Sequence, residues 1–378
     1  MLQTDRDKLN WLLVVGLGLL AIVFVTAQII YTDTYWNSLQ RLAQQKYSGP
    51  GIAVRPTPTK VKGLYLTAYS AGNPKKIQEI TDLIGHTELN SVVIDLKDYS
   101  GFILYDSKLP FVNEHQLKDV RLKDVAGLVK ELKAKHIYTI ARLSAFQDPL
   151  LAVKKPEWAL KSKYGGLWRD RKGLAWVDPT REEVWQYVAS VAHEAARLGF
   201  DEINFDYIRF PTDGNLAAIV YTNGGQKRYD VIRKFFSYIS RSLAREPVYL
   251  SADLFGLTTE KTGTDDMSIG QRLGDAVKYF DYVCPMVYPS HYPPGYMNFA
   301  NPAEHPYEVV FQAITAGVRQ ADDHRAKIRA WIQAFDMGAI YDGAKIRAQI
   351  SAAEKAGSDG WVMWNASNRY SADGLLPK

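Results

Sequence analysis

Short β-prone stretches alternate with longer stretches of helical periodicity along most of the chain. The β-prone stretches are rich in Val, Ile, Leu and aromatic residues and cover residues 61–69, 91–98, 138–146, 202–210, 248–256, 281–288, 327–335 and 360–366. Between them, apolar residues recur every three or four positions, as on one face of an amphipathic helix, for example at 73–88, 121–136, 181–199, 227–246 and 343–357. This alternation predicts an α/β fold with a parallel sheet and helical crossovers.

Eight strands close a (β/α)₈ TIM barrel, whose usual size is about 250 residues. The alternative is an open doubly wound sheet, which would carry a Gly-rich phosphate-binding turn after its first strand. The sequence at that point reads LTAYSAGNP and does not match such a turn. We therefore predict the barrel. No helical pattern follows the eighth stretch, so we expect the segment before Val61 or a loop to cover that side.

The N-terminal part of the chain has a different pattern. Trp11–Ile30 is an uncharged and mostly apolar run of 20 residues, long enough to cross a bilayer as a helix. Arg6 and Lys8 precede it and Asp33 follows it, which favours a cytoplasmic N-terminus. A cleaved signal peptide, after which the barrel would be secreted, is the alternative reading, because Val25–Ala27 (VTA) resembles a cleavage site. We expect a cytoplasmic tail (1–10), a transmembrane anchor (11–30), a linker with a Pro- and Gly-rich end (31–60) and an extracytoplasmic barrel (61–378).

Composition and charge narrow the possible functions. The net charge of +5 over 378 residues includes no basic block, so we expect no nucleic-acid partner. Cys284 is the single cysteine, which excludes an intrachain disulfide and a Cys-based zinc site. None of the seven His residues has the H-x-H or H-x-x-x-H spacing of a metallohydrolase, and we expect no metal and no cofactor.

Polar residues gather at the ends of the predicted strands, where TIM barrels carry their active sites. Strand residues alternate between the barrel interior and the helix layer. Asp206 therefore shares a face with Asn204, Asp253 shares a face with Ser251, and both carboxyls are expected to point inward. By the same parity, Asp95 and Lys97 share a face. The further residues expected at this end are Asp98, Arg142, Arg209, Tyr288, Gln333 and Trp364, and together with Lys97 they are expected to bind substrate.

Two carboxylates on adjacent strands are what glycoside hydrolysis requires. One is ionised and attacks the anomeric carbon or activates water, while the other is protonated and donates to the leaving oxygen. A nearby arginine keeps the first ionised, and burial raises the pKa of the second. Arg142 and Arg209 are expected to orient Asp206, and aromatic rings such as Trp364, Tyr288, Trp168 and Trp176 to stack on sugar faces.

Five stretches resemble the putative glycosyl hydrolase domain family of (β/α)₈ barrels, from about Val61 to the end of the chain: VKGLYLTAYSAG, VVIDLKDYSG, DEINFDYIRFPTDG, LSADLFG and GWVMWNAS. In the broader alpha-amylase-type layout, an Asp on the fourth strand is the nucleophile and an acid on the fifth is the proton donor. The resemblance thus implies Asp206 as nucleophile and Asp253 as acid. Amylase-type enzymes have Glu on the fifth strand, so Asp95 or Asp98 is an alternative acid.

Other roles are open for several of these residues. Asp206 could be a structural carboxylate bonded to Arg142 or Arg209, and Trp364 could belong to the core. Lys97 could form a Schiff base, as in barrel aldolases, but a strand-end Lys more often neutralises neighbouring acids such as Asp95 and Asp98. We expect a membrane-anchored barrel that hydrolyses an oligo- or polysaccharide. The alternative is a catalytically inactive barrel that binds glycan or acts as a scaffold at the cell envelope.

Overall fold

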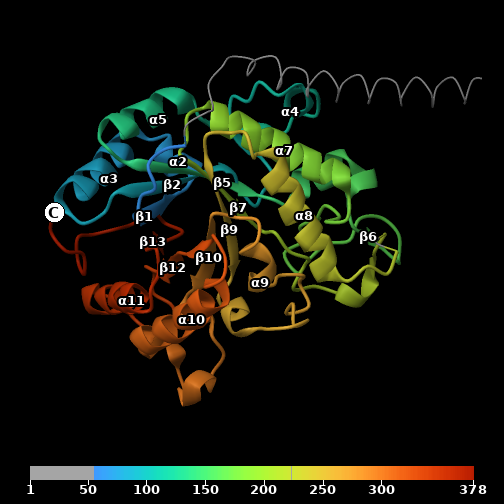
Figure 1. Cartoon of the computed structure of the whole chain (residues 1–378). Coiled ribbons are helices and arrows are strands. Elements are labelled where there is room, and N and C mark those ends of the chain that lie inside the picture. The colour runs from blue at the N-terminus through green and yellow to red at the C-terminus, as the bar shows by residue number, and fades with distance from the viewer. Residues whose placement is uncertain (1–54, 223) are drawn as a thin grey trace, which may run out of the picture. The chain divides into compact units, whose positions relative to one another are not determined.

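The computed structural model of the chain describes residues 55–222 and 224–378, and it shows the predicted barrel (Figure 1). Its eight parallel strands close into a ring, because the first strand pairs with both the second and the last. The expected tail (1–10), anchor (11–30) and most of the linker (31–60) lie outside the described residues. Within residues 55–222 and 224–378, every helix is too short or too polar to span a membrane.

The barrel strands match the eight predicted stretches. They are β1 Val61–Leu66, β2 Ser91–Lys97, β5 Tyr138–Ser144, β7 Glu202–Asp206, β9 Tyr249–Phe255, β10 Tyr282–Val287, β12 Ala330–Gln333 and β13 Gly360–Trp364. The stretch at 327–335 is interrupted, since β11 (Lys327–Ile328) and β12 pair separately with β10. Ile203, Phe205 and Leu250, which have the opposite parity to Asp206 and Asp253 on β7 and β9, are buried in the layer between sheet and helices.

Two smaller additions extend the sheet and the loops. β3 (Ile103–Tyr105) pairs antiparallel with β2, and β4 (Lys118–Leu122) pairs with β3. A separate antiparallel pair, β6 (Lys161–Ser162) and β8 (Ile219–Val220), joins the long loops that follow β5 and β7. Because these loops leave the C-terminal ends of their strands, they lie at the end of the barrel where the active site is expected.

The predicted helices surround the barrel. They are α3 Pro74–His86, α5 Val125–Ala134, α7 Glu182–Arg197, α8 Arg228–Ser242 and α11 Gly343–Lys355, joined by α10 Pro306–Ala321. The connections also contain the shorter helices α2 Ala68–Ala71, α4 Pro110–Glu114, α6 Pro149–Lys154 and α9 Leu273–Ala276. Short 3₁₀ helices occupy Pro156–Trp158, Leu216–Ala218, Gly256–Glu260, Pro289–His291, Tyr296–Asn298 and Pro302–Glu304.

The C-terminal segment covers the side of the barrel where no helix follows β13. Arg347 of α11 donates from Nε to the carbonyl oxygen of Gly374 at 2.7 Å. Two residues further on, the carbonyl oxygen of Leu376 accepts from the backbone N–H of Glu88, just after α3, at 2.9 Å. The C-terminal segment itself therefore covers this gap, in place of the expected segment before Val61 or a loop.

The lower part of the barrel interior is filled by side chains. Val61, Val93, Ile140 and Val362 point inward and are buried in one cluster. Beside them the fully buried Arg329 forms an ion pair with Glu202 at 2.8 Å. Since this end is packed, an open cavity can form only towards the C-terminal ends of the strands.

Candidate active site

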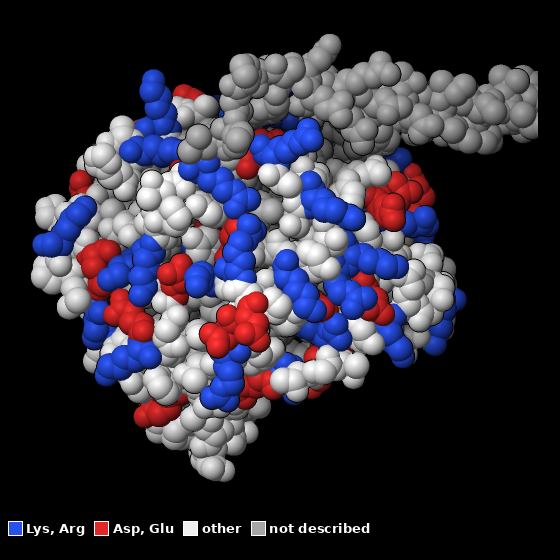
Figure 2. Space-filling model, in the orientation of Figure 1, with Lys and Arg blue, Asp and Glu red and all other residues white. Residues whose placement is uncertain are grey.

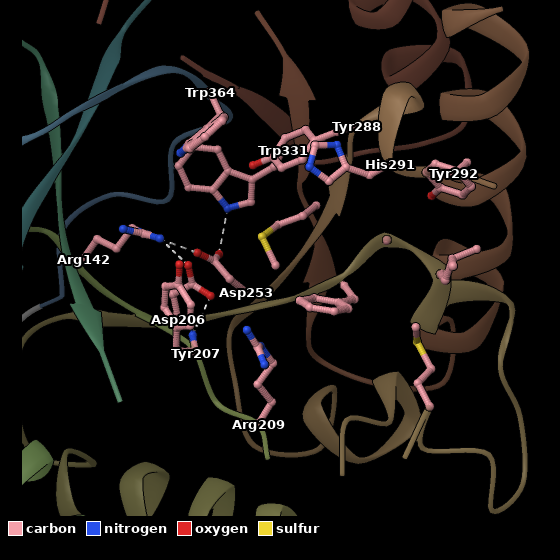
Figure 3. A pocket seen from close by; sticks show the side chains of 15 residues that line it. Arg142, Asp206, Tyr207, Arg209, Asp253, Tyr288, His291, Tyr292, Trp331 and Trp364 are labelled. Carbon is pink, nitrogen blue, oxygen red and sulfur yellow. Dashed lines mark hydrogen bonds and ion pairs between the residues drawn. The ribbon is translucent and has the colours of Figure 1, made fainter. Parts of the chain in front are cut away.

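A cavity of about 350 Å³ opens at the C-terminal ends of the barrel strands (Figure 3). Its walls come mainly from β7, β9, β10, β12 and β13 and the loops that follow them. Six of the residues predicted from the sequence line it, namely Arg142, Asp206, Arg209, Asp253, Tyr288 and Trp364. The predicted parity of β7 and β9 therefore brings both proposed catalytic carboxylates into one cavity.

Arg142 of β5 lies at the centre of the polar part of the site. Its Nη1 donates to Asp95 at 2.6 Å, its Nη2 donates to Asp206, and its Nε lies 3.6 Å from Oδ2 of Asp253. The guanidinium is buried, with only 9% of the residue exposed. One buried cation cannot compensate three buried anions, so the environment favours a proton on at least one of the carboxyls.

The two donors to Asp206 both stabilise a negative charge on it. Arg142 binds Oδ2, and the backbone N–H of Tyr207 donates to Oδ1 at 2.5 Å. The second bond forms because the chain turns sharply after β7, where Tyr207 has a φ of 52°. That left-handed backbone is unfavourable for a residue other than glycine, and such strain is common at functional sites.

Asp253 of β9 has the opposite environment. Its Oδ1 accepts from Nε1 of Trp331 at 2.7 Å and from Nδ2 of Asn204 at 2.8 Å, and the residue is 1% exposed. Burial, and then the charge of Asp206, raise the pKa of Asp253 to about 8, although Arg142 opposes the increase. The carboxyl is therefore largely protonated at neutral pH, as a proton donor must be.

Asp95, the alternative acid, lies behind Arg142 and does not line the cavity. Its Oδ1 accepts from Arg142, and its Oδ2 accepts from the hydroxyl of Tyr65. Burial raises the pKa of Asp95, and Arg142 partly offsets this effect. Asp95 therefore positions Arg142, and the structure gives it no direct access to a ligand in the cavity.

The prediction that Lys97 shares a face with Asp95 was wrong. Asp95 pairs with Arg142, but Lys97 pairs with Leu143, so Leu96 is an extra residue in the ladder. Such a bulge reverses the side-chain direction beyond it. Lys97 consequently points to the helix layer, where its Nζ lies 2.8 Å from Oδ2 of Asp148. It neutralises Asp148, instead of the expected Asp95 and Asp98.

Asp98 and Gln333 lie at the expected strand ends, but both form hydrogen bonds with the loops there. Asp98 accepts from the backbone N–H of Ser100 at 2.9 Å in the turn after β2. Gln333 is fully buried, accepts from Ser290 N–H at 3.1 Å and donates to the Phe335 carbonyl at 2.9 Å. Neither lines the cavity, so their predicted contact with substrate finds no support in this geometry.

Aromatic rings form one wall of the cavity. Trp364 stacks on Tyr288 at a centroid distance of 5.6 Å, and both line the cavity. Trp168 and Trp176, in contrast, are each 2% exposed and belong to a small core within the loops, so the expectation that they stack on sugars was wrong. Hydrophobic burial of both indoles holds the loop around β6 and β8 together.

Arg209 lines the cavity but forms no hydrogen bond or ion pair with Asp206, so the expectation that it orients this carboxylate was wrong, and the two charges interact only at longer range. Its Nη1 donates to the Phe210 carbonyl at 3.2 Å and lies 3.4 Å from the hydroxyl of Thr212. Figure 3 shows the guanidinium extending into the cavity from the side opposite Trp364.

Two residues that sequence reasoning did not assign to the site complete it. Trp331 lines the cavity and donates to Asp253, and Asn204 donates to the same oxygen. Strand parity could have found both, because Trp331 is two residues before Gln333 and Asn204 is two before Asp206. Among the described residues, no group of three or more His, Cys, Asp or Glu is arranged to hold a metal ion.

Residues 63–370 match the model of a family described as "Putative glycosyl hydrolase domain". No curated protein matches the chain. A hypothetical protein from Ruminiclostridium thermocellum is 39% identical over 50% of this chain and 96% of its own, with a TM-score of 0.48.

Two solved structures share the fold at low sequence identity. The PgaB (BpsB) glycoside hydrolase domain from Bordetella bronchiseptica is 14% identical over 82% of this chain and 95% of its own, with a TM-score of 0.59. The alpha-galactosidase TtGalA from Thermus thermophilus is 13% identical over 83% of this chain and 59% of its own, with a TM-score of 0.52. Both likenesses establish the barrel architecture.

Proposed function

We propose that the chain, which belongs to the Putative glycosyl hydrolase domain family, hydrolyses glycosidic bonds in an oligo- or polysaccharide. Asp206 acts as the nucleophile and Asp253 as the general acid and base. The observation that carries this proposal is the contrast between the two carboxyls in one cavity. Asp206 accepts from a guanidinium and a backbone N–H, whereas burial raises the pKa of Asp253 to about 8. Glycoside hydrolysis requires this division between an ionised and a protonated carboxyl.

The chemistry follows from the two environments. In the first step Asp206 forms a bond to the anomeric carbon, the glycosidic C–O bond breaks, and Asp253 gives its proton to the departing oxygen. Asp253 is then ionised, takes a proton from water, and the resulting hydroxide oxygen displaces Asp206 from the anomeric carbon. The proton taken from water restores the protonated form of Asp253, and the cycle consumes one water without a cofactor.

The strand register favours this retaining route. β7 and β9 pair with Phe205 opposite Ala252, and the next position on each strand is Asp206 and Asp253. Neighbouring strands are about 4.8 Å apart. Both carboxyls lie beside the guanidinium of Arg142, and a pair held this close suits the ~5–5.5 Å separation of retaining glycosidases better than the ~6.5–9.5 Å of inverting ones.

The cavity also suits a sugar ring. Trp364 and Tyr288 provide apolar surface, and no described residue forms a hydrogen bond with the Tyr288 hydroxyl, which is thus available to a ligand. Ligand sites typically combine such apolar walls with a few polar groups that orient the ligand.

The location of the barrel is part of the same proposal. The uncharged run at 11–30, with Arg6 and Lys8 before it, supports an anchor that holds the barrel outside the cytoplasm. Reporter fusions after residue 10 and residue 60 test it. Opposite locations of the two reporters, with the full-length chain in the membrane fraction, support the anchor. A chain shortened at Ala27 and released from the membrane would instead indicate signal cleavage.

The catalytic proposal is tested by sugar release from the full-length chain against a panel of bacterial envelope and storage glycans, with Asp206→Asn in parallel. New reducing ends from the wild type, lost in Asp206→Asn at unchanged thermal stability, support the hydrolase. Equal release by both proteins overturns the role of Asp206. Glycan binding by both proteins without release would favour the inactive binding barrel.

A further inference from the structure

Arg209 is a buried cation that forms no ion pair with a described residue, and the charges of Asp206, Asp213 and Asp170 act on it only from a longer distance. Only 8% of the residue is exposed, and no Asp or Glu among the described residues lies within ion-pair distance of its guanidinium. Its protein hydrogen bonds come from Nη1 alone, to the Phe210 carbonyl and the Thr212 hydroxyl. Buried arginines are normally paired, because removal of their charge from water is costly.

Three aromatic rings surround the same guanidinium. Its carbon lies 4.9 Å from the ring centroid of Trp176, 5.1 Å from that of Phe255 and 5.4 Å from that of Tyr207. Rings at these distances stabilise a cation through their π faces and restrict the side chain to one position. They provide no acceptor for Nε and Nη2, so these donors remain available.

The available donors belong to the same cavity as the two catalytic carboxyls. Arg209 lines it, together with Asp206 and Asp253 (Figure 3). A ligand that reaches Asp206 and carries a negative group could therefore pair with Arg209 at the same time. The planar guanidinium matches a carboxylate through two parallel hydrogen bonds.

The loop that provides Trp176 also carries exposed cations. Lys163, Arg171 and Lys172 are exposed, and none forms an ion pair with a described residue. Figure 2 shows Lys and Arg side chains, with a smaller number of Asp and Glu side chains among them, around the position that β6 has in Figure 1. A positive potential beside the cavity would attract an anionic chain before it binds.

We propose that the cavity binds a glycan whose sugar units carry a carboxylate, and that Arg209 pairs with this carboxylate and so determines specificity. This inference deepens the proposed hydrolase and rests on it for the identity of the cavity as a sugar site. Two sources fit the chemistry: a uronic acid, with its carboxylate at C6, and a sugar with a lactyl ether, as in N-acetylmuramic acid.

A binding experiment tests the inference without requiring hydrolysis. The probes form two pairs of a charged and a neutral sugar: D-glucuronate with D-glucose, and N-acetylmuramic acid with N-acetylglucosamine. Each sugar is titrated into the full-length chain, and binding is followed by calorimetry or tryptophan fluorescence. Wild type should bind the charged member of one pair about 10- to 100-fold more tightly, as expected for a charge-assisted hydrogen-bonded pair. The pair that shows the preference identifies the source of the carboxylate.

Three variants test whether Arg209 causes the preference for the charged sugar. Arg209→Gln should abolish it, and Arg209→Lys should keep part of it, because Lys retains the charge but not the planar pair of donors. Arg245→Gln is the matched control. It removes the same charge from an exposed residue just before β9, at the opposite end of the barrel, and should leave the preference unchanged.

The outcomes separate this inference from the proposed function. Equal affinity for charged and neutral sugars, an unchanged preference in Arg209→Gln, or no saturable binding of either charged sugar would overturn the carboxylate specificity. Asp206→Asn should retain the preference. If charged sugars bind through Arg209 but no glycan is cleaved, the specificity stands and the hydrolase proposal fails.

Discussion

The indole Nε1–H of Trp331 donates to Oδ1 of Asp253 at 2.7 Å, across the barrel mouth from β12 to β9. Asn204 binds the same oxygen, so Oδ2 is the atom left to carry a proton. The bond from Trp331 stabilises the ionised carboxyl and thereby opposes the effect of burial on its pKa. A residue that has no charge thus influences the pH range in which the acid is protonated.

Trp331→Phe should move the alkaline limb of the pH–activity profile upward. Loss of the Nε1–H donor raises the pKa of Asp253 further above its value of about 8, and a general acid is active while it is protonated. The measurement is kcat/KM against pH for the glycan that the wild type cleaves. Trp361→Phe, which alters a fully buried indole on β13 that does not line the cavity, is the control and should leave the limb in place. An unmoved limb in Trp331→Phe would argue against Asp253 as the acid.

Asp253→Asn should stabilise the fold increasingly as the pH rises. Asp253 has a folded-state pKa of about 8, above its ordinary value of 3.8, so its contribution to stability is fully present below pH 3.8 and is lost as the pH rises to about 8. Asn at this position does not ionise, so the variant does not lose stability in this way as the pH rises. The difference in Tm, variant minus wild type, should therefore increase between pH 4 and about pH 8 and then level off. A difference that does not vary with pH would show that the pKa of Asp253 is not raised.

Arg142→Met should destabilise the fold by about 3–5 kcal/mol, since it leaves Asp95 and Asp206 without their cation. Urea unfolding at pH 7 measures this change. Arg142→Met combined with Asp95→Asn and Asp206→Asn removes the uncompensated charges and should recover part of the loss. If the triple variant is less stable than Arg142→Met, Arg142 is held by packing and not by its charge partners.

Lys97→Met should also cost about 3–5 kcal/mol, because it leaves the fully buried Asp148 unpaired. Lys97 lies away from the cavity, so KM for the cleaved glycan should be unchanged at a temperature where the variant is folded. Loss of stability with constant KM identifies a structural ion pair. A raised KM with unchanged stability would restore the sequence-based prediction that Lys97 binds substrate.

Strand parity predicted the position of the two carboxyls because β7 and β9 are regular up to Asp206 and Asp253. It failed at Lys97, where the bulge at Leu96 reverses the direction of the side chain. Bulges depend on how neighbouring strands pair, which a single strand sequence does not encode. The surroundings of Arg209 could not be predicted from the sequence either, because Trp176 and Phe255, which contact it, lie far from it along the chain.

The anomeric configuration of the glycosyl azides formed by Asp206→Ala and Asp253→Ala distinguishes the nucleophile from the acid and base. Each variant is supplied with azide and the dinitrophenyl glycoside of the sugar that the wild type releases. Asp206→Ala should give an azide of inverted configuration, because azide attacks from the position of the missing carboxylate. Asp253→Ala should give an azide of retained configuration, since the intermediate on Asp206 still forms. A retained azide from Asp206→Ala, or hydrolysis by this variant at the wild-type rate, would show that Asp206 is not the nucleophile.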